Sequence, residues 1–137
     1  MHMKIKQVLL AGCLLLAAHA GMTQDVSPRD QFKVFASPSE ISITKGSLDS
    51  VELTIVRAKH FRRVGQFGLG SPIPKGVSVI INAIAGKPDH FVMYLQADDS
   101  ANPGKFYLIP SYQVSGSPRK GVLVRVIVVE KPIIETK

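Results

Sequence analysis

Positive charge is concentrated in one short segment, residues 57–63, which reads RAKHFRR. Guanidinium groups can hold a carboxylate or phosphate through paired hydrogen bonds, and imidazole and phenyl rings can stack on a bound group. The side chains with this chemistry are Arg57, Lys59, His60, Phe61, Arg62 and Arg63. The pattern indicates a candidate binding surface for an anionic protein or an anionic envelope component. The alternative is an ordinary solvated turn, in which Phe61 packs against a sheet edge and the arginines point into water.

Side chains that could carry out catalysis are scattered along the chain. His60 and His90 are the only histidines after residue 20, and their spacing does not match a metal motif such as H-x-x-x-H. The same part of the chain has no cysteine and no G-x-S-x-G nucleophile elbow. Asp98, Asp99 and Asn102 could approach a calcium ion, but a calcium loop needs more oxygen ligands at fixed offsets, which favours an ordinary turn. We expect a protein that is not an enzyme and has no metal site and no cofactor.

The first 20 residues have the parts of a secretory signal peptide. Residues 1–7 include two lysines, residues 8–18 are almost entirely apolar, and Ala18 and Ala20 are small residues at the positions that signal peptidase requires. An apolar run of about 11 residues is shorter than the roughly 20 needed to span a membrane, and no later run is as long. The sequence therefore predicts export to the periplasm or the cell surface, with no transmembrane helix in the mature chain.

A second interpretation of this leader stays open. Residues 10–13 read LAGC and resemble a lipobox, in which Cys13 would be acylated and become the first residue. Only about five apolar residues precede Cys13, and the apolar run continues after it, so the pattern favours cleavage after Ala20. The alternative is an outer-membrane lipoprotein, anchored at Cys13, with a structural or assembly role.

The charge balance limits the class of partner. The chain has 17 Lys and Arg against 10 Asp and Glu, a formal net charge of +7. Two of the lysines lie in the leader, so the remainder still has a basic excess, which favours acidic partners and anionic surfaces. We do not expect nucleic acid as a partner, because export separates the protein from most of it and no nucleic-acid-binding module is recognisable.

Short segments of alternating apolar and polar residues recur after residue 30, with turn residues between them. We expect strands at residues 31–36, 40–44, 50–57, 64–69, 77–85, 90–97, 105–114 and 121–130. Val51, Leu53 and Ile55 share one face of their strand, and the valines at 122, 124 and 126 share a face of the last strand. Strands of this length with regular turns predict an all-β sandwich. A single domain at residues 31–131 would follow a linker at 21–30 and precede a tail at 132–137.

Two of these strands have unusual features. Pro110 has no N–H to donate to a neighbouring strand, so we expect a bulge within residues 105–114. The strand at residues 121–130 is apolar on both faces, which predicts that part of it is covered on both sides.

The chain resembles the bacterial immunoglobulin-like domains of exported and cell-surface proteins. The similar segments are FKVFASPSEISITKG, SVELTIVR, PKGVSV, FVMYLQADDSANPGKFYLIP and VLVRVIVVE, which together extend from Phe32 to Glu130. The resemblance implies an immunoglobulin-like β-sandwich of about seven strands. It places residues 57–63 in a loop that connects the two sheets at one end of the sandwich. It also implies that an aromatic residue at 106 or 107 has its ring in the core, with Tyr107 the one whose hydroxyl could reach the backbone. The family's roles are adhesion, spacing and contact with proteins or glycans, so the resemblance implies a non-catalytic interaction module.

Overall fold

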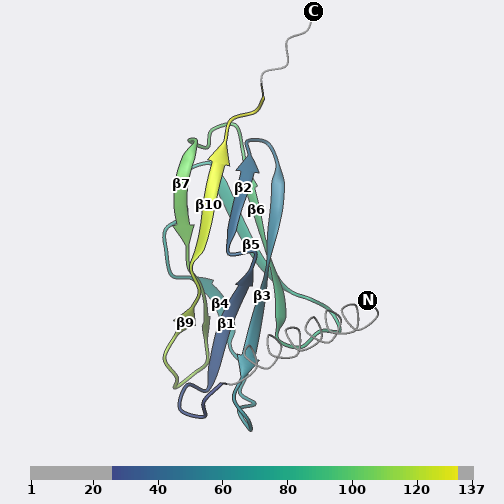
Figure 1. Ribbon diagram of the computed structural model, residues 1–137, viewed down its shortest axis with the longest axis vertical. Helices are drawn as coiled ribbons and strands as arrows, with labels where there is room; N and C mark the ends of the chain where they lie inside the picture. The colour runs from purple at the N-terminus through teal and green to yellow at the C-terminus, as the bar shows by residue number, and fades with distance from the viewer. Residues whose placement is uncertain (1–25, 133–137) are drawn as a thin grey trace, which may run out of the picture.

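A computed structural model describes residues 26–132 (Figure 1). Within this range every regular element is a β-strand, which confirms the predicted all-β fold. No helix in this range is long and apolar enough to cross a membrane. The predicted signal peptide at residues 1–20, including Cys13, lies outside the described residues, as do residues 21–25 of the predicted linker and residues 133–137 of the predicted tail.

The strands follow the predicted alternating segments closely. They are β1 (Phe32–Ser37), β2 (Glu40–Thr44), β3 (Leu48–Arg57), β4 (Gln66–Leu69), β5 (Val77–Ala83), β6 (His90–Ala97), β7 (Gly104–Leu108), β8 (Pro110–Gln113), β9 (Lys120–Gly121) and β10 (Val124–Val129). Short breaks separate β1 from β2, β7 from β8 and β9 from β10. When each broken pair is counted as one strand, the domain has the predicted seven strands.

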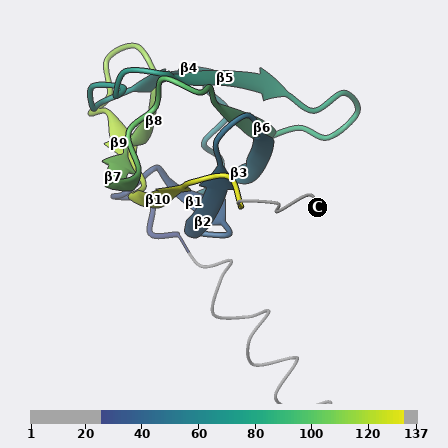
Figure 2. The same ribbon diagram turned by 90° about the horizontal axis from the view of Figure 1, so that it is seen from above.

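The strands form two layers that pack face to face. One layer is a four-stranded antiparallel sheet in the order β1-β3-β6-β5. The other consists of two short ladders in the orders β2-β10-β7 and β4-β8-β9, in which only the β2–β10 pairing is parallel. Seen from above, the strands of both layers surround a common interior (Figure 2). This is the immunoglobulin-like sandwich that the resemblance implied.

The second layer is divided in two near Pro110. β7 pairs with β10, whereas β8 pairs with β4 and β9, and the break between β7 and β8 falls at Ile109. Because proline cannot donate a backbone hydrogen bond, the ladder cannot continue unchanged through this position. The N–H of Val122 donates to the carbonyl of Pro110 at 3.1 Å and links the two ladders. Instead of the predicted bulge within one strand, the structure has a break at Ile109 and a change of pairing partner.

The interior is built from the predicted faces. Val51 and Leu53 from β3 and Val124 and Val126 from β10 have no exposed surface and belong to one apolar cluster. Ile55 is buried in a second, mainly aromatic cluster around Phe32, Tyr112 and Val114, and the half-buried Val122 packs against both clusters. Burial of apolar surface between the layers is the main force that holds the two sheets together.

Of two predictions about side-chain burial, one holds in part and one is wrong. On the outer face of the last strand Arg125 and Ile127 are half-buried, as predicted for part of its length, whereas Leu123, just before β10, is 55% exposed and Val129 is 37% exposed. Tyr107 is 50% exposed, and Tyr112 has the buried ring instead, with its hydroxyl accepting a hydrogen bond from the N–H of Gly65 at 2.7 Å. The reason is the strand period of two, which turns Leu108, Pro110 and Tyr112 inward and Tyr107 outward.

Candidate functional site

Two loops lie at the lower end of the sandwich in Figure 1, and a third projects to one side near this end. They are the β3–β4 loop (residues 58–65), the β5–β6 loop (residues 84–89) and the β8–β9 loop (residues 114–119), and we call them together the loop end. The β3–β4 loop contains most of the basic segment found in the sequence and passes from the four-stranded sheet to the other layer, as predicted. Loops at the ends of such sandwiches are held by a rigid scaffold and are common binding surfaces.

Arg57, the last residue of β3, ties two of these loops together. Its Nε donates to both carboxylate oxygens of Asp89 at 2.9 Å, and its Nη1 donates to the carbonyl of Arg63 at 2.5 Å. The guanidinium carbon also lies 5.6 Å from the centre of the Phe61 ring. The Arg57 side chain is only 12% exposed, so its charge is already neutralised by Asp89 and is not presented to a partner.

Phe61 is part of the scaffold. Its ring stacks on Phe32 with a centroid distance of 5.7 Å and an interplanar angle of 25°, and Phe32 in turn meets Tyr112 edge to face at 5.6 Å. Offset and edge-to-face aromatic pairs add to the stability that burial provides. Phe61 therefore packs inward, as the solvated-turn interpretation predicted.

Arg63 connects the β3–β4 loop to the β8–β9 loop. Its Nη2 donates to the carbonyl of Ser115, across 52 residues of sequence. A backbone carbonyl is neutral, so Arg63 keeps its full positive charge while its position is fixed.

The remaining basic side chains of the loop end face solvent. Lys59, His60 and Arg62 are exposed, and the structure gives them no side-chain hydrogen bond or ion pair within residues 26–132. The other two loops add Lys87 and Arg119, which are also exposed. The only carboxylate within the three loops is that of Asp89, which already binds Arg57. The loop end therefore presents an excess of positive charge. One further carboxylate, that of Asp30, lies beside it, because the Ala58 N–H donates at 2.7 Å to the carbonyl of Gln31, the next residue in the chain.

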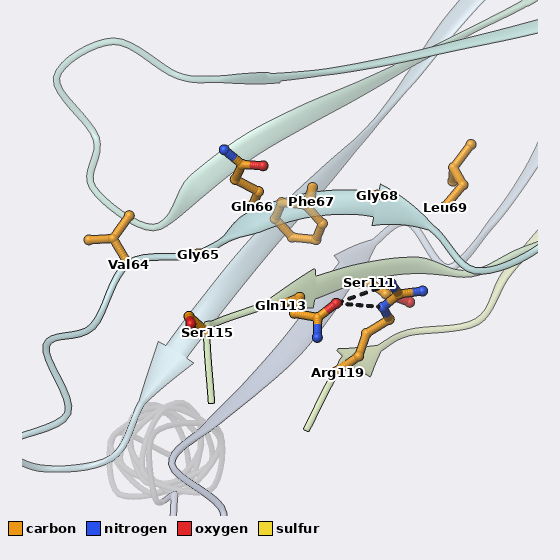
Figure 3. A pocket seen from close by; sticks show the side chains of 10 residues that line it. All are labelled: Val64, Gly65, Gln66, Phe67, Gly68, Leu69, Ser111, Gln113, Ser115 and Arg119. Carbon is orange, nitrogen blue, oxygen red and sulfur yellow. Dashed lines mark hydrogen bonds between the residues drawn. The ribbon is translucent and has the colours of Figure 1, made fainter. Parts of the chain in front are cut away.

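A hollow of about 630 Å³ lies beside the loop end, on the outer surface of β4 and β8 (Figure 3). Gln66 and Gly68 of β4, Gln113 of β8 and Arg119 of the β8–β9 loop line it. The Oε1 of Gln113 accepts hydrogen bonds from Arg119 Nε at 3.2 Å and Nη2 at 3.1 Å. Sequence analysis missed this site, because its residues come from three separate segments. In the local sequence, only the two glycines at 65 and 68 pointed to this hollow.

Groups that could support catalysis are not brought together. His60 lies alone on the β3–β4 loop, and His90 Nδ1 lies 3.1 Å from Glu52 Oε1 on an open sheet face. Among residues 26–132, no serine hydroxyl is hydrogen-bonded to either histidine. No group of three or more His, Cys, Asp or Glu within the described chain is placed to hold a metal ion.

The Asp98 turn has the geometry of a local backbone turn. Its Oδ1 accepts hydrogen bonds from the Ser100 hydroxyl at 2.6 Å and the Ser100 N–H at 2.7 Å. The hydroxyl bond from Ser100, followed by the backbone bond, lowers the pKa of Asp98 below its usual value of 3.8. These bonds agree with the turn interpretation of residues 98–102.

Comparison with the solved structure of a surface-layer protein supports the fold. No protein-family model matches the sequence, and no curated protein matches it. A solved structure of domains 1–6 of the surface-layer protein SbsC matches with a TM-score of 0.52 and 14% sequence identity, over 74% of this chain and 13% of that one. The BIgI domain of beta protein from S. agalactiae, solved bound to CEACAM1, matches with a TM-score of 0.46 and 11% identity, over 74% of this chain and 99% of that one. The chain thus spans about an eighth of the SbsC structure, and at this identity the likeness concerns the fold alone.

Proposed function

We propose that this protein is an exported, non-catalytic immunoglobulin-like module that binds an anionic partner, a protein or an envelope component, through the loop end. The observation that carries the proposal is the set of exposed cations on three loops that Arg57 and Arg63 link, within which the only carboxylate, that of Asp89, is bound by Arg57. Export rests on the leader-like sequence of residues 1–20, and a periplasmic or cell-surface location follows from it.

The scaffold makes this surface suitable for recognition. Arg57 and Arg63 hold the three loops together, and Phe61 fixes the β3–β4 loop onto the aromatic cluster. A surface that is ordered before binding loses less conformational entropy when a partner arrives. Arg57 and Phe61 thus act as positioning residues, whereas Lys59, His60 and Arg62 are the side chains that would touch the partner.

The direct test is reversal of the two free charges of the β3–β4 loop. The Lys59→Glu, Arg62→Glu double variant should bind an envelope fraction of the host about tenfold more weakly at low salt, because two attractive contacts become repulsive. The matched control is Lys33→Glu with Lys105→Glu, which changes the net charge equally at exposed positions on the two sheet faces. Equal retention of the double variant and the control would contradict the proposal. Arg63 is left unchanged because its loss would also release the β8–β9 loop.

The lipobox-like sequence before Cys13 favours a second candidate, in which the same domain is tethered to the outer membrane. The intact mass of protein purified from its host separates the two forms. A diacylated chain that begins at Cys13 establishes the tether, whereas a chain that begins near Gly21 excludes it.

A further inference from the structure

The hollow beside the loop end contains a glycine that the fold does not require. At Gly68 the backbone φ is not positive, and a Cβ would meet no atom within 4 Å. Gly65, by contrast, is required, because a Cβ there would lie 2.1 Å from the carbonyl oxygen of Gln113. Glycine inside a strand costs about 0.5–1 kcal/mol relative to alanine. A strand glycine often marks a bulge, a tight bend or a place where a ligand or another backbone approaches closely. Of these explanations, we consider the close approach of a ligand.

Strand register places Gly68 on the outer surface, facing the hollow. Gly68 pairs with Ser111 and Gln66 pairs with Gln113, so these residues form two adjacent rows across β4 and β8. The Gly68–Ser111 row has almost no side-chain bulk, whereas the Gln66–Gln113 row has two amide groups. The hollow is therefore a shallow recess with a bare floor and a polar rim.

Polar side chains at the rim keep hydrogen-bond donors that the fold does not use. Because Gln113 Oε1 accepts from Arg119, the Gln113 amide nitrogen keeps its two donors for another molecule, and Arg119 keeps its Nη1 donors. Figure 3 shows Gln113 and Arg119 joined along one side of the recess, with Gln66 projecting from β4 on the other side. Amide and guanidinium groups of this kind suit a ligand with many hydroxyl and carboxylate oxygens.

The recess continues into the loop end. Arg119 and Ser115 belong to the β8–β9 loop, and Arg63 donates to the carbonyl of Ser115. A long anionic ligand could thus contact the exposed cations and the recess together. This favours a polymer that combines negative charge with neutral hydrogen-bonding groups. The lining also includes Val64, an exposed apolar side chain, so an acidic peptide is the competing occupant that the experiment must separate from a polysaccharide.

We propose that the recess over Gly68 is a saccharide subsite, and that the ligand of the loop end is an acidic polysaccharide. This inference rests on the proposed function and names the class of partner. A sugar ring would lie on the bare Gly68–Ser111 floor and hydrogen-bond to Gln113, Gln66 and Arg119. Carboxylate or phosphate groups on neighbouring sugar units would contact Lys59, Arg62 and Arg63.

The decisive variant is Gly68→Leu, which places a side chain in the recess at a position where a Cβ meets no atom within 4 Å. Binding is measured by calorimetry with polygalacturonate as the acidic polysaccharide, poly-L-glutamate as an acidic chain without sugar rings, and dextran as a neutral polysaccharide. We expect Gly68→Leu to weaken polygalacturonate binding about tenfold and to leave poly-L-glutamate binding within about twofold. Gln113→Ala should act in the same direction with a smaller effect. The matched control is Asn82→Leu, which adds the same side chain at an exposed position on β5.

The two proposals fail in different ways. If the wild-type protein binds poly-L-glutamate and polygalacturonate equally, and Gly68→Leu changes neither, the saccharide subsite is wrong and the cationic binding surface stands. If neither polyanion binds at low salt, the proposed function is wrong as well. Thermal unfolding of each variant shows whether the fold is intact, and Gln113→Ala keeps the test valid if Gly68→Leu is unstable.

Discussion

The two ends of the sandwich differ in whether their charged side chains are paired with each other. At the end opposite the loop end, formed by the turns at residues 45–47 and 98–103 and by residues 130–131, cations and carboxylates pair with each other. Lys45 contacts Glu130 and Lys131 contacts Asp99, each at 2.9 Å. At the loop end, Arg57 takes the only carboxylate of the three loops, and the other cations contact neutral groups or solvent. The proposed binding role of the loop end therefore rests on the availability of charge there and not on the net charge of the domain.

The pairs at the two ends also differ in burial. In the Arg57–Asp89 pair the side chains are 12% and 29% exposed, whereas in the Lys131–Asp99 pair they are 57% and 80% exposed. Exposed pairs contribute little to stability because water and salt screen them. A partly buried pair with two hydrogen bonds holds its geometry, because release of either partner leaves a charge without compensation. The Arg57–Asp89 pair thus gives the loop end a fixed support beneath its exposed basic side chains.

The largest effect is expected from the aromatic base of the loop end. Phe32→Ala should lower the free energy of unfolding by about 3–5 kcal/mol, because Phe32 has no exposed surface and supports both Phe61 and Tyr112. Phe35→Ala is the control, since Phe35 lies on the same strand but is 40% exposed. Chemical denaturation measures both variants. A loss below about 1 kcal/mol for Phe32→Ala would show that the aromatic cluster does not support this end.

The second-largest effect is the difference in folding free energy lost when an ion pair is broken at each of the two ends. Asp89→Ala leaves Arg57 partly buried without its carboxylate, and it should cost about 2–3 kcal/mol of folding free energy after allowance for the exposed part of the pair. Glu130→Ala removes an exposed partner at the opposite end and should cost at most about 1 kcal/mol. Equal losses in urea unfolding would contradict the distinction between a scaffold pair and a surface pair.

The smallest effect concerns Asp98, at the opposite end. Because Ser100 lowers the folded-state pKa of Asp98, the contribution of this carboxylate to stability is present above its unfolded pKa and is lost as pH falls through the lower, folded pKa. In Ser100→Ala the pKa of Asp98 should rise, since the largest cause of the shift is the Ser100 hydroxyl. NMR titration of the side-chain carboxyl follows this change. An unchanged pKa would show that the hydroxyl bond is not formed in solution.

Local periodicity was sufficient to predict most of the fold. Alternation in 50–57 and 121–130 located β3 and β10 and their buried faces, because one face of each strand must be apolar to bury against the other layer. Because Pro110 has no N–H to donate, its presence predicted an irregularity in the second layer. The error at Tyr107 came from the family resemblance, which was given more weight than the strand parity that turns Tyr112 inward.

The candidate site was only partly predictable. The sequence showed the cluster of charge at 57–63, but it did not show which charges remain free. Arg57 is neutralised by Asp89, which lies 32 residues away, and Arg63 is fixed by Ser115, which lies 52 residues away. The recess over Gly68 depends on strand register and on the path of the β8–β9 loop. Such contacts between distant segments follow from the assembled fold and not from local pattern.

The most direct measurement is amide chemical-shift mapping of the purified protein during titration with poly-L-glutamate at low salt. The account predicts that the shifts change at residues 58–65, 84–89 and 114–119, and that added salt reverses the changes. The turns at residues 45–47 and 98–103, where charges are already paired, should stay unchanged. Shift changes centred on those turns, or spread evenly over all exposed lysines and arginines, would contradict a binding surface at the loop end.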